Sequence, residues 1–240
     1  MPNRNPKALV VSSGGLDSTV AIYDMINQGC EVATISFDYG QRHKKELDFA
    51  AATASRLDLR HHSIDLSGLS SVLAESGSSL VSEEAVPEGH YAEDNMKKTV
   101  VPNRNMMMLA VAGSVAVSTD CNFIVTGVHA GDHAVYPDCR PRFISLVSDA
   151  LVQGNAGFGD MRGVLAPFVH MSKTEIAHLG MDLHVPFEST WSCYKGGEIH
   201  CGKCGTCVER LEAIHDAGAD EYDQTEYADV KFWKEAIANA

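Results

Sequence analysis

The stretch that decides the fold is Ala-Leu-Val-Val-Ser-Ser-Gly-Gly-Leu-Asp-Ser-Thr, residues 8–19. Its first four residues are all apolar, which predicts a buried strand of a parallel sheet. Residues 20–26 then place apolar side chains at helical spacing, and Gly29 ends that pattern. A strand, a turn of small residues and a helix N-terminus predict an anion site, because backbone N–H groups converge there and the helix dipole favours negative charge.

Each residue type in the turn fits the binding of phosphate. Gly14 and Gly15 let the backbone approach an oxyanion closely, and the serine and threonine hydroxyls add donors. Asp17 would repel a phosphate unless a cation lay between them, and Mg²⁺ would meet that need. The plain alternative is an ordinary strand-to-helix turn with a serine cap. The residues predicted to bind the nucleotide are Val11, Ser12, Ser13, Gly14, Gly15, Leu16, Asp17, Ser18 and Thr19.

The turn differs from two common nucleotide-binding motifs. No Gly-Lys-Ser or Gly-Lys-Thr follows at the Walker spacing, and Gly-x-Gly-x-x-Gly is absent. It resembles instead the Ser-Gly-Gly-x-Asp-Ser loop of ATP pyrophosphatases, the enzymes that cut ATP between its α- and β-phosphates. That resemblance implies nucleotide chemistry and leaves the second substrate open.

Composition and charge narrow the class of protein. The chain has 240 residues, 45% hydrophobic and 21% charged, the profile of an enzyme built as one α/β domain with a small appendage. Its formal net charge of −13 disfavours a nucleic-acid partner, because contact with a polynucleotide backbone needs a basic surface. There is no run of eighteen apolar residues, and the opening residues do not resemble a signal peptide. We therefore expect a cytoplasmic protein without a membrane partner.

Strand and helix patterns alternate through the rest of the chain. This order predicts an α/β fold in which an open parallel sheet carries helices on both faces, as in Rossmann-like proteins. Periodicity fails over 67–98, and a loop this long is usually a lid. We expect a nucleotide-binding domain at 1–185 that includes this lid, followed by a C-terminal helical region at 186–240. Further strands are predicted at 31–37, 61–66, 122–127 and 164–168.

Polar residues gather where the predicted strands end, which is the edge at which open parallel sheets bind ligands. Arg104 stands at the start of a predicted helix, where a cation is unfavourable unless an anion lies beside it. Asp132 follows the fourth predicted strand, and Lys173 lies in a Ser-x-x-Glu capping box that opens another helix. Cys139 is the candidate for a reactive thiol, because the neighbouring Arg140 would lower its pKa.

Four of the seven cysteines form the pattern Cys-x7-Cys-x2-Cys-x2-Cys. Cys-x2-Cys lets two thiolates reach one metal from a tight turn, and four thiolates suit a closed structural Zn²⁺ site. An iron–sulfur cluster is an alternative, although ferredoxins continue with Cys-Pro where this chain has Val208 and Glu209. Sulfur transfer by free thiols is a second alternative. The predicted zinc ligands are Cys193, Cys201, Cys204 and Cys207.

Four more segments accompany the opening loop and the terminal cysteines in one order. The whole set resembles the 7-cyano-7-deazaguanine synthase family, also called preQ0 synthase or QueC, from about Leu9 to Leu211. Asn103 departs from the family, which usually has glycine there. The segments are Phe-Asp-Tyr-Gly-Gln-Arg-His at 37–43, Val-Pro-Asn-Arg-Asn at 101–105, Tyr-Pro-Asp-Cys-Arg at 136–140 and Thr-Trp-Ser-Cys-Tyr at 190–194.

The resemblance implies an adenine nucleotide α-hydrolase-like fold and an ATP-dependent carbon–nitrogen ligase of queuosine-type biosynthesis. Its substrates would be 7-carboxy-7-deazaguanine, ammonia and ATP, and adenylated intermediates would lead to the nitrile preQ0. Asp17 and Asp132 would hold Mg²⁺, while Lys173, Arg104 or Arg140 would offset negative charge on the substrates. The family also implies a homodimer. A tRNA thiolase with the same loop is the alternative, and a nucleotide sensor carrying zinc is a third reading.

Overall fold

The computed structural model describes residues 5–238, so the first four and the last two residues of the regions expected at 1–185 and 186–240 lie outside it. Its centre is a five-stranded sheet in the order β3-β2-β1-β4-β5, with every neighbouring pair parallel. This confirms the predicted open parallel sheet. The strands are β1 Lys7–Val11, β2 Glu31–Asp38, β3 Arg60–Asp65, β4 Phe123–Val125 and β5 Gly163–Leu165.

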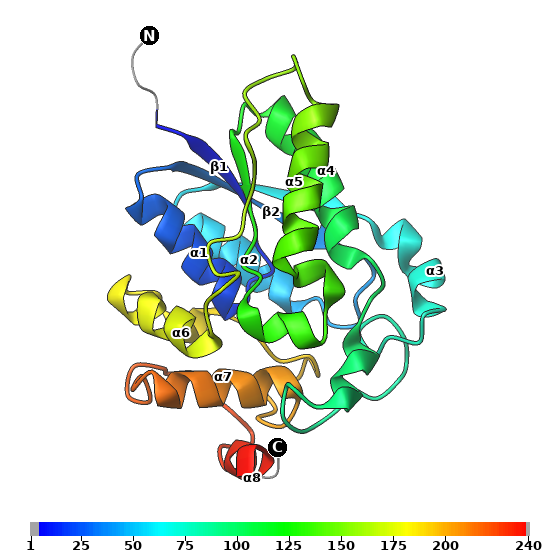
Figure 1. Cartoon of the computed structure of the whole chain (residues 1–240). Helices are drawn as coiled ribbons and strands as arrows, with labels where there is room; N and C mark the ends of the chain where they lie inside the picture. Colours follow the sequence, from blue (N-terminus) through cyan, green and yellow to red (C-terminus); the bar gives the residue numbers. More distant parts are fainter. Residues whose placement is uncertain (1–4, 239–240) are drawn as a thin grey trace.

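The helices cover both faces of the sheet (Figure 1). One hydrophobic cluster joins α1 and α6 to strand residues such as Ala8 and Val10, and a second joins α4 and α5 to Leu9 and Ile124. Successive residues of β1 therefore belong to clusters on opposite faces of the sheet, as the alternation of side chains along a strand requires. The helices are α1 Leu16–Asn27, α2 Lys45–Arg56, α3 Ser70–Ala74, α4 Arg104–Ser118, α5 Pro141–Gly154, α6 Lys173–Asp182, α7 Gly205–Asp216 and α8 Phe232–Ala238.

Two of the predicted strands are shorter in the structure. The fourth ends at Val125, and the fifth spans only Gly163–Leu165 instead of 164–168. Thr126 still donates to the Leu165 carbonyl of β5 at 3.0 Å, but at Gly127 the backbone passes the start of α1 so closely that a Cβ there would lie 3.1 Å from the Asp17 carbonyl carbon and the Ser18 nitrogen. The sequence pattern therefore overestimates the length of β4, whose end turns toward α1.

The segment 67–98 contains helical turns rather than a featureless loop. It holds α3 and two short 3-10 helices, Ser67–Leu69 and Asp94–Thr99, and it buries Leu80 and Met96. Glu88 forms an isolated bridge with Cys204 and an ion pair with Lys195. The segment is thereby attached to the cysteine region near the other end of the chain. Within residues 5–238, none of the helices is long and apolar enough to span a bilayer.

The strand order places a natural binding crevice between β1 and β4. The chain winds outward from β1 through β2 to β3 on one side, and through β4 to β5 on the other. The connections after β1 and β4 therefore diverge at the carboxyl edge of the sheet, which is where open α/β sheets bind ligands. Both the predicted phosphate loop and the segment that carries Asp132 begin at this edge.

Candidate active site

The predicted phosphate loop forms a tight turn between β1 and α1. Gly14 has a φ of +77°, and any Cβ there would clash with the backbone of Glu46 on α2, so the turn requires glycine. The hydroxyls of Ser13 and Ser18 lie 3.3 Å apart, and the Gly14 carbonyl accepts a 2.8 Å hydrogen bond from the Trp191 backbone. Contacts with α2 and with the backbone of Trp191 therefore hold the loop in this shape.

A cavity of about 210 Å³ opens beside this loop. Six of the nine predicted loop residues line it, whereas Ser12, Gly14 and Thr19 stand behind the cavity wall. The hydroxyl oxygens of Ser12 and Thr19 are buried without a hydrogen-bond partner among the described residues. The loop residues that line the cavity are Val11, Ser13, Gly15, Leu16, Asp17 and Ser18.

A lysine bridges two carboxylates on one wall of the cavity. Lys173 Nζ lies 2.6 Å from Asp17 Oδ2 and 3.4 Å from Glu209 Oε2. Burial opposes the charge of Lys173, but the two carboxylates outweigh it and raise its pKa above the ordinary range. Burial likewise opposes the charge of Asp17, yet Lys173 and His129 hold its pKa below the ordinary value. This wall therefore carries a fixed ammonium group at neutral pH.

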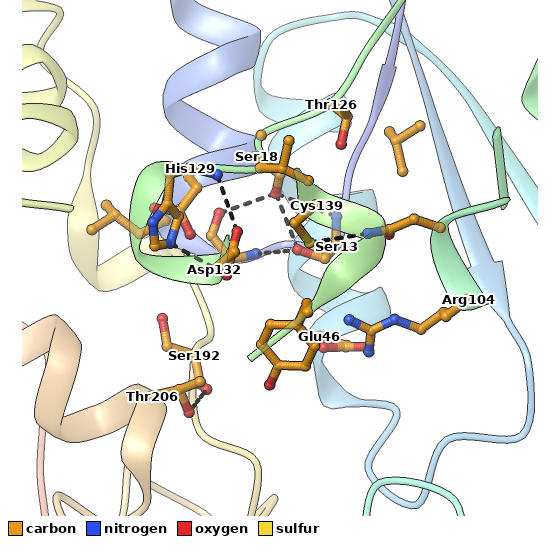
Figure 2. A pocket seen from close by; sticks show the side chains of 18 of the residues that line it. Ser13, Ser18, Glu46, Arg104, Thr126, His129, Asp132, Cys139, Ser192 and Thr206 are labelled. Atoms are coloured by element: carbon orange, nitrogen blue, oxygen red, sulfur yellow. Dashed lines mark hydrogen bonds and ion pairs between the residues drawn. The ribbon is translucent and has the colours of Figure 1, made fainter. Parts of the chain in front are cut away.

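Asp132 is tied into the same wall by the turn that follows β4. Its Oδ2 accepts a 3.0 Å hydrogen bond from the His129 backbone, and its Oδ1 accepts one of 3.0 Å from the Tyr91 hydroxyl. His129 Nε2 lies 3.7 Å from Asp132 Oδ1 and 3.8 Å from Glu209 Oε1. Figure 2 shows His129 and Asp132 together at one side of the cavity. The structure thus brings Asp17, Lys173 and Asp132 together, as the sequence predicted.

Glu209 is a cavity residue that sequence reasoning missed. It sits on α7 two positions after Cys207, and burial raises its pKa above the ordinary value. The sequence holds a faint signal, because Glu209 and Arg210 are adjacent charges in an otherwise apolar turn of helix. Arg210 is fully buried and donates hydrogen bonds to Thr190 Oγ1 and the Phe187 carbonyl, so only one charge of this pair faces the cavity.

Arg104 also lines the cavity, on the side opposite His129. Its Nη1 donates to the Tyr39 hydroxyl at 3.2 Å, and Figure 2 shows its guanidinium beside Glu46. The start of α4 is capped by Asp138, whose Oδ2 accepts from the backbone nitrogen of Asn105. Asn103 makes no side-chain cap; its φ of +56° is left-handed, a conformation that glycine adopts freely and asparagine tolerates. That geometry explains how asparagine replaces the usual glycine.

Arg140 and Cys139 do not fit the roles expected from sequence. Arg140 is exposed, stands outside the cavity lining, and donates from Nε to the His133 carbonyl at 3.0 Å. Cys139 does line the cavity, but the prediction that its pKa is lowered was wrong. Burial, reinforced by Asp132 and Asp138, raises the pKa of the Cys139 thiol well above its ordinary value. The thiol therefore stays protonated at neutral pH.

The four predicted ligand cysteines converge on one point. Their sulfur atoms all lie within 4.8 Å of one another, and Cys201 Sγ and Cys207 Sγ are 3.9 Å apart. Ligands of a tetrahedral zinc at about 2.3 Å are about 3.8 Å from each other, so this spacing fits the metal. The backbone nitrogens of Lys203 and Cys204 donate to Cys201 Sγ, which orients that sulfur. Four sulfur ligands complete a closed site and favour a structural metal.

The chain matches the family model described as queuosine biosynthesis protein QueC over residues 7–218. A 7-cyano-7-deazaguanine synthase from Chelativorans sp. is 51% identical over 97% of this chain and 98% of the relative. The protein of the same name from Ruegeria pomeroyi is 50% identical over 96% of this chain and 98% of its own.

Two solved structures are more distant. NMN synthetase from Francisella tularensis is 13% identical with a TM-score of 0.48, covering 97% of this chain and 85% of that one. The U34-tRNA thiolase NcsA from Methanococcus maripaludis with its 4Fe-4S cluster is 11% identical with a TM-score of 0.47, covering 98% and 70%. Similarity at this level carries no argument about function.

Proposed function

This chain belongs to the QueC family of queuosine biosynthesis proteins, and from that membership we propose that it makes 7-cyano-7-deazaguanine from 7-carboxy-7-deazaguanine, ammonia and ATP. The observation that carries the proposal is one cavity in which Asp17 of the phosphate loop lies beside Lys173, which in turn lies beside Glu209. Such a site suits a carbon–nitrogen ligase that activates a carboxylate by adenylation.

The proposed chemistry replaces a poor leaving group with a good one, because a free carboxylate would have to expel hydroxide whereas its adenylate expels AMP. In the proposed first step a carboxylate oxygen attacks the α-phosphorus of ATP, the bond to the β-phosphate oxygen breaks, and pyrophosphate leaves. Ammonia then attacks the carbonyl carbon, expels AMP and loses a proton to give the amide. A second adenylation, now on the amide oxygen, lets that oxygen depart with AMP while the nitrogen loses its protons. The product is the nitrile.

The cavity residues fit these steps. Backbone N–H groups and hydroxyls of the loop would hold phosphate oxygens, and the Lys173 ammonium would offset charge that develops as pyrophosphate leaves. Asp17 Oδ1 is buried without a partner among the described residues, so it is available to a divalent cation. When bound with ATP, Mg²⁺ would neutralise phosphate charge, with Asp17 and Asp132 as its protein ligands. Arg140 lies outside the cavity and so is not among the groups that would offset this charge.

The cysteine cluster supports a structural Zn²⁺, one per chain. Its closed set of four sulfur atoms leaves no ligand position for substrate, and its spacing fits tetrahedral zinc.

We also propose a cytoplasmic location, where thiols stay reduced, and a homodimer, which light scattering would reveal as twice the 25.9 kDa chain mass. Exposed apolar side chains such as Phe158, 76% exposed, are available for such a contact.

A single assay tests the proposed function. Protein, ATP, Mg²⁺, ammonium and 7-carboxy-7-deazaguanine are incubated, and the nitrile and pyrophosphate are quantified by mass spectrometry and a coupled assay. We expect nitrile from the wild type and a loss of at least about 100-fold in pyrophosphate release from Asp17→Asn, because the phosphates lose their cation. Asp149→Asn, on the exposed surface of α5, should behave like the wild type. Unchanged release by Asp17→Asn would refute the assignment.

A further inference from the structure

One side of the cavity holds charged and aromatic groups that the adenylation steps leave unused. Glu46 on α2 and Arg104 on α4 both line it, and Figure 2 shows their charged ends side by side, opposite His129 and Asp132. Tyr39, Trp191 and Tyr194 line the same side and continue into a smaller adjoining cavity. Flat rings around a carboxylate and a guanidinium form a pocket suited to a planar, hydrogen-bonding heterocycle.

The two charged groups retain hydrogen-bonding capacity. Among the described residues, Glu46 forms no ion pair within 4.0 Å, and its hydrogen-bond donor is Gln41 Nε2 at a distant 3.4 Å. Gln41 is itself fixed, because it donates to the Phe37 carbonyl and accepts from the Tyr39 backbone. Arg104 has five N–H donors, and among the described residues its side chain donates to the Tyr39 hydroxyl. The pair therefore presents a carboxylate acceptor and free guanidinium donors to whatever occupies the cavity.

A guanine-type base has the matching edge. Its six-membered ring presents a carbonyl oxygen, a ring N–H and an exocyclic amino group in sequence, that is, one acceptor followed by two donors. A carboxylate accepts from two adjacent donors with its two oxygens, and a guanidinium donates to the carbonyl. Adenine instead offers one amino donor beside an unprotonated ring nitrogen, which a carboxylate repels.

We propose that Glu46 and Arg104 recognise the six-membered-ring edge of the 7-deazaguanine substrate, Glu46 accepting from the ring N–H and the amino group while Arg104 donates to the carbonyl oxygen. This assignment rests on the proposed function, which supplies that substrate. The carboxyl group of the base is on its five-membered ring, away from the recognised edge. A base held at Glu46 thus directs its carboxyl group toward the loop of Ser13 and Ser18, where ATP is activated.

The test compares two bases in two proteins. KM is measured for 7-carboxy-7-deazaguanine, for its analogue without the 2-amino group, and for ATP, in the wild type and in Glu46→Gln. We expect Glu46→Gln to raise KM for the natural base about 10-fold or more, to change KM for ATP less than about 3-fold, and to lose the wild-type preference for the 2-amino base. Asp48→Asn, exposed on the same helix, is the matched control. Thermal melting establishes that both variants fold.

The outcomes separate this inference from the proposed function. A wild type that makes no nitrile overturns both. Normal conversion with an undiminished preference for the 2-amino base in Glu46→Gln overturns the recognition role alone. A rise in KM for ATP without a rise for the base would show that this pair recognises adenine. Glu46→Asp, which keeps the carboxylate but withdraws it by one methylene, should retain part of the preference.

Discussion

At the scale of single residues, the site depends on groups whose charge is set by their neighbours. Lys173 stays protonated because Asp17 and Glu209 flank it, and Cys139 stays neutral because it is buried, with Asp132 and Asp138 adding to the effect of burial. Sequence reasoning found Asp17 and Lys173, since each belongs to a local motif. It missed Glu209, because the adjacent charges at 209 and 210 do not reveal the contact between α7 and α6 that brings Glu209 to Lys173.

Glu209→Gln should therefore weaken the reaction while preserving the fold. The amide still fills the site, but Lys173 and His129 lose a negative neighbour. We expect kcat/KM to fall about 10- to 100-fold with little change in melting temperature. Glu212→Gln, three residues further along α7 and paired with His90 outside the cavity, is the control. Equal losses in the two variants would show a general effect on the helix instead.

Glu46 makes the stability of the ligand-free protein depend on pH. Burial raises its pKa to about 7, against about 4.3 in an unfolded chain. The folded state therefore binds the proton more tightly, and this group makes stability fall as pH rises from about 4.3 to about 7. Glu46→Gln removes that loss, so its advantage over the wild type in urea unfolding should be greater at pH 8 than at pH 5, by roughly 1–2 kcal/mol. Parallel unfolding curves at both pH values would contradict the shift.

At the scale of elements, the cysteine cluster fixes the start of α7. Cys204 is the residue before the helix, and Cys207 lies in its first turn. The same cluster contacts the 67–98 segment through the bridge between Glu88 and Cys204. The metal site could be predicted from the sequence because all four cysteines lie within fifteen residues. The contact of 67–98 with this site could not be predicted, since that segment has no periodicity and its partners are distant in the chain.

Removing the metal should therefore loosen α7 and residues 88–90 together. Cys204→Ser, or treatment with a strong chelator, is expected to lower the melting temperature by several degrees and to increase hydrogen exchange in both segments. Metal analysis of the untreated protein should give one Zn²⁺ per chain without visible absorption bands. Brown protein with iron would show a cluster instead. Exchange confined to α7 would disprove the coupling to 88–90.

At the scale of the whole molecule, alternating strand and helix patterns predicted the parallel sheet correctly. They did not predict where β4 ends, because the chain just beyond it approaches α1 closely at Gly127, a tertiary contact that side-chain type does not reveal. The net charge of −13 also acts at this scale, since it opposes polyanions over distances longer than any one contact.

The acidic surface should keep the protein from RNA. In a gel-shift titration at about 0.1 M salt, we expect no complex with tRNA at concentrations that saturate a basic RNA-binding protein. A tRNA thiolase would bind, and its affinity would fall steeply with added salt. A tight, salt-sensitive complex would thus reopen that alternative. Conversion of the free base in the same preparation gives the positive control.

The hydrogen bond from the Trp191 backbone to the Gly14 carbonyl joins the phosphate loop to a segment that lies far from it in the sequence. The phosphate loop precedes Trp191 and Glu209 in the chain, so it is synthesised before them. A nascent or prematurely terminated chain accordingly has a phosphate loop but no finished cavity around it. We therefore expect a fragment that ends before Trp191 to lack part of the cavity lining and, with it, the activity proposed above.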